Sequence, residues 1–76
     1  MNVTIAKVHE NVFAGEAVSV TLKTTEGEIT ILPSHEPLVA NLIPGAVTVR
    51  TKDGPQKFEI DGGVLEVSNN QVTVLL

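Results

Sequence analysis

The residues of this chain best suited to chemistry are two histidines, each followed by a glutamate, in His9-Glu10 and His35-Glu36. Imidazole and carboxylate groups together can bind zinc or non-haem iron. Small β-barrel metal sites usually gather at least three ligands, often two on one strand at His-x-His spacing, because alternating side chains then share a face. That spacing is absent. We predict no metal and no other cofactor, with a small His/carboxylate metal-binding barrel kept as an alternative.

The sequence supports covalent catalysis no better than it supports a metal site. The chain contains no cysteine, and no nucleophile-elbow motif surrounds its serines, Ser19, Ser34 and Ser68. Lys52 precedes the turn pair Asp53-Gly54, where a biotinyl or lipoyl carrier domain would place its acceptor lysine, so a carrier domain is a further alternative. The acceptor lysine of such domains stands in a sequence that resembles Met-Lys or Asp-Lys. Here the order is Lys-Asp, which favours an ordinary exposed lysine. We predict that the chain itself has no enzymatic activity.

Composition limits the class of partner. Of the 76 residues, 5 are Lys or Arg and 9 are Asp or Glu, the net charge is −4, and aromatic residues make up 3%. Nucleic acid requires a basic footprint or aromatic stacking platforms, so it is excluded as a partner. Hydrophobic residues reach 42% and charged residues only 18%, which excludes intrinsic disorder. A small domain with so little surface charge is suited to protein contacts.

Apolar and polar residues alternate along most of the chain, and no amphipathic helix appears. In residues 16–23, every second residue from Val18 to Leu22 is apolar, as in a half-buried strand. The same pattern recurs near both termini and in several runs between them. It predicts one core formed by Val18, Val20, Leu22, Ile29, Ile31, Val47, Val49, Ile60, Leu65, Val67, Val72 and Val74.

Turn residues separate these runs at intervals of about ten residues. They are Phe13-Ala14-Gly15, Glu26-Gly27, Pro44-Gly45, Asp53-Gly54, Asp61-Gly62-Gly63 and Asn69-Asn70. Many short strands with turns at this spacing predict an all-β fold, a β-sandwich or flattened barrel of about ten strands, in a single domain spanning residues 1–76. Residues 36–43 fit either a short strand or a helical turn, and we favour the strand. The uncharged run 37–49 is shorter than the about 20 residues that a membrane-spanning helix needs.

Glycine and proline positions indicate where the chain must turn. Gly27 permits a tight reversal between two strands, and Pro33 and Pro37 stop strand pairing on either side of His35, which places His35 in an exposed loop. Gly62-Gly63 suits a sharp bend or a close approach of two backbones, and simple turn geometry is favoured there over direct binding.

The segment that contains these residues resembles a known family. Residues 25–38, TEGEITILPSHEPL, resemble the EGEIxILPGHxPL pattern of the epsilon subunit of rotary F-type ATP synthases. The resemblance continues through 12–15 (VFAG), 42–45 (LIPG), 58–67 (FEIDGGVLEV) and 72–75 (VTVL), in order and across nearly all of the chain. Three positions depart from the pattern: Ser34 replaces a glycine, Glu36 a small residue, and Asp61 a serine.

The resemblance implies a mechanical function. Such a subunit is part of the rotor and links the gamma subunit to the c ring, so that ion-driven rotation is coupled to ATP synthesis. It implies a location at the cytoplasmic face of the bacterial inner membrane, peripheral and held through the complex, or at the organellar equivalent.

The resemblance also implies roles for individual residues. Glu26, Glu28 and His35 are expected at the interface with the c ring, whose loops often carry basic side chains, and Gly27, Pro33, Gly62 and Gly63 are expected to shape the turns. Family members commonly continue into two C-terminal helices that inhibit ATP hydrolysis or bind ATP. Residues 1–76 show no such helical pattern, so we expect this chain to couple rotation without inhibiting hydrolysis and without binding ATP.

Overall fold

Alternation of buried and exposed residues produces nine β-strands and no helix in the computed structural model, which describes residues 1–76. No segment therefore forms a helix that could cross a membrane. The strands are β1 (Asn2–Lys7), β2 (Glu10–Glu16), β3 (Ser19–Thr24), β4 (Gly27–Ile31), β5 (Leu38–Leu42), β6 (Gly45–Thr51), β7 (Gly54–Ile60), β8 (Gly63–Ser68) and β9 (Gln71–Leu75).

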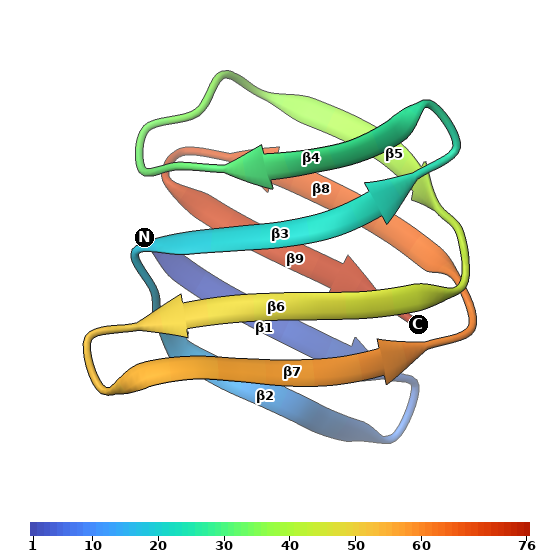
Figure 1. The fold of residues 1–76 in the computed structure, drawn as a ribbon, viewed down its shortest axis with the longest axis horizontal. Helices are drawn as coiled ribbons and strands as arrows, with labels where there is room; N and C mark the ends of the chain where they lie inside the picture. Colours follow the sequence, from blue (N-terminus) through green and yellow to red (C-terminus); the bar gives the residue numbers. More distant parts are fainter.

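The strands form two layers that face each other (Figure 1). The layer nearer the viewer has the order β4-β3-β6-β7, and the layer behind it has the order β5-β8-β9-β1-β2. A single residue pair, Thr24 with Leu42, joins β3 to β5 and connects the layers into one continuous sheet. Only β1 and β9 pair in parallel. The predicted all-β sandwich is confirmed, with nine strands rather than about ten.

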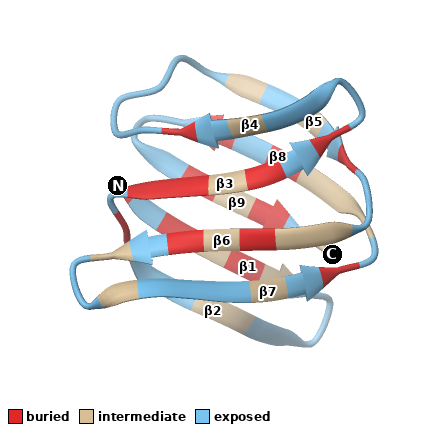
Figure 2. Cartoon of the chain, viewed as in Figure 1, coloured by how far each residue is buried: buried red, intermediate tan, exposed pale blue.

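The core lies between the two layers (Figure 2). Both layers contribute fully buried branched side chains, because the alternation directs every second residue inward. The side chains with under 2% exposure are Ile5, Leu22, Ile31, Leu65, Val3, Val20, Val47, Val49, Val72 and Val74. Most of the predicted core is therefore correct, and Ile29 packs against it while remaining partly exposed.

The prediction of Val18 as a core residue is wrong. Its side chain is 54% exposed, because β2 ends at Glu16 and the chain bends at residues 17–18 before β3 begins at Ser19. At this bend the chain passes from the rear layer to the front layer, and the amide of Val18 donates a hydrogen bond of 2.7 Å to the Arg50 carbonyl. The bend changes the phase of the alternation, which turns Val18 outward and buries Ala17 instead.

The assignment of Phe13-Ala14-Gly15 to a turn is also wrong. These residues lie within β2, which pairs antiparallel with β1 through a register shift between Ile5 and Ala6. The actual turn before β2 is at residues 8–9. Phe13 packs against Phe58 of β7, with ring centroids 5.6 Å apart, and so bridges the outer strands of the two layers. Residues 36–43 contain strand β5, as favoured from the sequence.

Candidate protein interface

Strand β4 has a free edge. It pairs only with β3, in a register that sets Glu28 opposite Lys23 and Ile31 opposite Val20. Figure 1 shows β4 as the outermost strand of the front layer. The N–H and C=O groups along such an edge are open to a partner. The segment that resembles the epsilon pattern therefore occupies an accessible border of the sandwich.

The hairpin before β4 is held by local hydrogen bonds. Thr24 is buried, and its hydroxyl accepts a hydrogen bond from the Glu26 amide at 3.1 Å and donates one to the Gly27 carbonyl at 2.9 Å. Gly27 has a φ of 123°, a conformation that residues with a Cβ rarely adopt. Thr51 makes the same two contacts with Asp53 and Gly54 in the β6–β7 hairpin. The side-chain hydrogen bonds of the β3–β4 turn are thus local, and one backbone hydrogen bond, from the Thr25 amide to the Asn41 carbonyl of β5 at 3.0 Å, joins the turn to the rear layer.

The carboxylates of this hairpin are exposed and unpaired within the chain. The one ion pair in the structure joins the amino group of Met1 to Glu16, so neither Glu26 nor Glu28 is neutralised internally. Although Glu28 lies opposite Lys23 across the strand pair, the Lys23 side chain packs over Gly45 of β6, where a Cβ would come within 3.2 Å of its Cδ. Both carboxylates can therefore pair with cations on a partner.

The loop after β4 crosses from the front layer to the rear layer. Residues 32–37 are all exposed, and they begin with a turn in which the His35 amide donates a hydrogen bond to the Leu32 carbonyl at 3.2 Å. Pro33 and Ser34 are the central residues, and Ser34 has a φ of 64°. Proline followed by a residue with positive φ defines a type II turn, which favours glycine at the second central position. The Nδ1 atom of His35 lies 2.7 Å from the Glu36 carbonyl oxygen.

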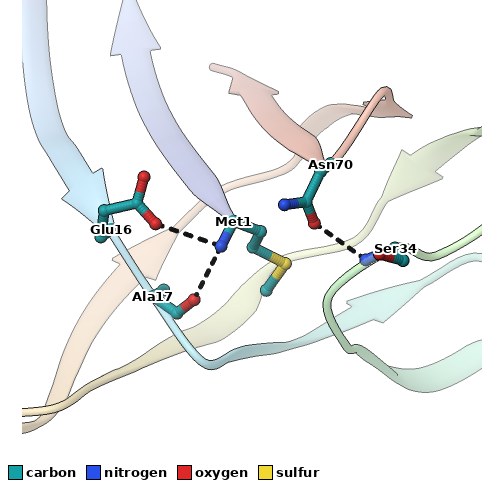
Figure 3. A network of polar contacts seen from close by, with 5 residues as sticks. All are labelled: Met1, Glu16, Ala17, Ser34 and Asn70. Carbon is teal, nitrogen blue, oxygen red and sulfur yellow. Dashed lines mark hydrogen bonds and ion pairs between the residues drawn. The ribbon is translucent and has the colours of Figure 1, made fainter.

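One hydrogen bond ties this loop to the rest of the fold. The Ser34 amide donates to the side-chain Oδ1 of Asn70, in the β8–β9 turn, at 2.8 Å (Figure 3). The two residues are 36 positions apart in the sequence.

The predicted interface residues lie along β4 rather than at one point. Glu26 and Glu28 flank the beginning of the strand, whereas His35 follows its end at Ile31. With a rise of about 3.3 Å per residue, Glu28 and Ile31 are separated by roughly 10 Å, and the loop continues beyond. The three side chains can contact one partner only if that partner lies along the length of β4.

Gly62 and Gly63 serve close backbone packing at another site. A Cβ on Gly63 would clash with the Leu75 carbonyl oxygen, and one on Gly62 would lie 3.3 Å from the Leu42 carbonyl oxygen. Their φ values are 127° and 147°. They allow β8 to start directly against β9 and β5.

Comparison with known proteins places this arrangement in a family. Residues 1–76 match the family described as ATP synthase, Delta/Epsilon chain, beta-sandwich domain. The chain belongs to this family. The ATP synthase epsilon chain of Corynebacterium jeikeium is 44% identical over 73 residues, which cover 93% of this chain and 59% of that protein. The epsilon chain of Delftia acidovorans is 41% identical, over 99% of this chain and 55% of that protein.

Solved structures agree with the sequence comparison. A chain of the Euglena gracilis mitochondrial ATP synthase, in an assembly of OSCP, F1 and c-ring, superimposes with a TM-score of 0.88 at 29% identity, covering 96% of this chain and 48% of that one. A chain of the Tetrahymena thermophila mitochondrial ATP synthase central stalk and c-ring has the same fold, with a TM-score of 0.80 at 23% identity over 97% of this chain and 60% of that one. This chain thus spans between about half and three fifths of the length of the relatives it matches.

The residues behind the alternative predictions are distributed over several turns of this epsilon-type sandwich. His9 is in the β1–β2 turn, beside a hollow of about 890 Å³ lined also by Glu10, Glu59 and Asp61, and His35 is in the β4–β5 loop. No three histidine or carboxylate side chains come together in a geometry that could hold a metal ion. Lys52 is an exposed residue of the two-residue β6–β7 turn.

Two residues important for the candidate interface escaped the sequence analysis. Thr24 looked like an ordinary strand residue, although threonine three positions before a turn glycine could have indicated its hydrogen bonds. Asn70 was assigned only to a turn. Its contact with Ser34 joins distant parts of the chain, and no local pattern signals such a contact.

Proposed function

We propose that this chain is a non-catalytic rotor domain of an F-type ATP synthase, which links the gamma subunit to the c ring so that ion-driven rotation is coupled to ATP synthesis. The observation that carries the proposal is the family match over residues 1–76, with the characteristic segment 25–38 lying along a free strand edge. The domain acts mechanically, and its location is peripheral to the membrane, on the cytoplasmic side in bacteria, through the complex.

The c ring contacts the border formed by β4 and its two flanking turns. Glu26 and Glu28 present unpaired carboxylates there, which suits basic groups on the ring's loops. Charges at the rim of an interface mainly accelerate association and fix the orientation of the partners. His35 and the apolar Leu32, which is 57% exposed, extend the contact beyond the end of β4. The gamma subunit uses a different surface of the sandwich.

Charge reversal tests this assignment. Glu28→Lys should weaken assembly with the gamma subunit and the c ring several-fold at low salt, and the loss should shrink as salt screens the charges. Glu59→Lys is the matched control, because Glu59 is also exposed but lies on β7, at the other side of the front layer, and produces the same change in net charge. Co-purification and binding of the 76-residue chain measure the effect. An equal loss of binding in both variants would show that β4 is not part of the interface.

A further inference from the structure

A single hydrogen bond joins the β4–β5 loop to a residue outside it. Its residues 32–37 are all exposed, and none of them belongs to the core cluster. The hydrogen bonds of His35 stay within the loop, to Leu32 and Glu36. The bond from the Ser34 amide to Asn70 Oδ1 leaves the loop and reaches the rear layer.

Ser34 makes that contact more important. At a φ of 64° a serine is strained relative to glycine, so the turn has a weaker intrinsic preference for this shape than one with the glycine of the epsilon pattern. In a type II turn the amide of the second central residue points away from the turn and is free to bind elsewhere. The Asn70 carboxamide oxygen accepts this hydrogen bond.

Asn70 is itself held in place. It forms the β8–β9 turn with Asn69, both at positive φ (61° and 52°), as a two-residue type I′ turn requires. Its backbone carbonyl accepts a hydrogen bond from the Asn2 amide at 3.1 Å, which fixes the turn to the start of β1. Figure 3 shows the Asn70 side chain directed at the Ser34 amide.

From this geometry we propose that Asn70 is a positioning residue, whose side chain holds the β4–β5 loop in the shape that docks on the c ring. The docking half of this inference rests on the function proposed above, whereas the positioning half does not. Asn70 acts through Ser34 and does not itself need to touch the partner.

The test uses two neighbouring asparagines. Asn70→Gly keeps the positive φ of the turn and removes the side chain with its carboxamide, and Asn69→Gly makes the same change one residue earlier, where no hydrogen bond to the loop exists. We expect hydrogen exchange of the Ser34 amide, followed by NMR on the 76-residue chain, to accelerate about tenfold in Asn70→Gly and to stay unchanged in Asn69→Gly. Asn70→Asp retains an acceptor oxygen and should preserve the protection.

Binding to a preformed complex of gamma subunit and c ring completes the test. Asn70→Gly should weaken binding about three- to tenfold, because a loosened loop must be ordered on docking, and Asn69→Gly should not. Equal exchange of the Ser34 amide in both variants overturns the inference, as does faster exchange in Asn70→Gly with unchanged affinity. Failure of the unaltered chain to bind the complex would instead contradict the proposed function, while the exchange result would still stand.

Discussion

The two turns that flank β4 are built in different ways. The hairpin before the strand is stabilised by Thr24, whose hydroxyl binds two groups within three residues, and by the positive φ of Gly27. The loop after the strand crosses between layers and is fastened by a side chain 36 residues away. The side-chain hydrogen bonds at the first end are therefore local, although the Thr25 amide also donates to the Asn41 carbonyl of β5, whereas the side-chain hydrogen bond at the second end comes from a distant turn.

The largest expected effect comes from the core that supports both ends. Val20→Ala should lower the free energy of unfolding by about 2–3 kcal/mol, because Val20 is completely buried and its lost methyl groups leave a cavity. Val18→Ala is the control, since that side chain faces solvent, and it should change stability by less than about 0.5 kcal/mol. Urea unfolding followed by circular dichroism measures both. Similar losses would mean that the inward and outward assignments around the 17–18 bend are wrong.

A smaller effect should be confined to the hairpin end. Gly27→Ala should cost at least about 1 kcal/mol, because alanine is strained at a φ of 123° even though nothing obstructs its Cβ. Gly15→Ala, in β2 and without a positive φ, should be close to neutral. NMR of Gly27→Ala should show shifts around residues 24–28 and leave the Ser34 amide unaffected. A stability unchanged in Gly27→Ala would show that the turn does not require glycine.

The smallest change in stability should appear at the loop end, and it should be an increase. Ser34→Gly relieves the strain at φ 64°, which outweighs the greater freedom of glycine in the unfolded chain, so stability should rise by about 0.5 kcal/mol. Ser68→Gly, in β8, should instead lower stability by about 0.5–1 kcal/mol, because glycine weakens a strand. Thermal unfolding compares the two. Destabilisation by Ser34→Gly would show that the serine side chain stabilises the turn.

The sequence predicted what depends on neighbouring residues. Alternation identified Val20, Leu22 and Ile31 as core, and turn chemistry located the reversals at Gly27 and Asn69-Asn70. Prediction from the sequence failed where tertiary structure overrides the local pattern. The crossing between layers turns Val18 outward, and small residues that look like a turn pair as strand β2.

The candidate site shows the same division. The family pattern selected Glu26, Glu28 and His35, but only the structure separates the glutamates from the histidine by the length of β4. The dependence of the loop on Asn70 arises from the packing of the two layers, which brings residues 34 and 70 together. Local alternation and turn residues contain no information about that contact.

Site-directed cross-linking tests most directly whether β4 faces the c ring. The chain contains no cysteine, so single substitutions give unambiguous attachment points. Glu28→Cys and His35→Cys should each cross-link to the c subunit in the assembled enzyme, because the proposed contact runs along the whole strand. Glu66→Cys, which is exposed on β8 of the rear layer, should not. Cross-linking of positions 28 and 35 exclusively to the gamma subunit would contradict the assignment of β4 to the c ring.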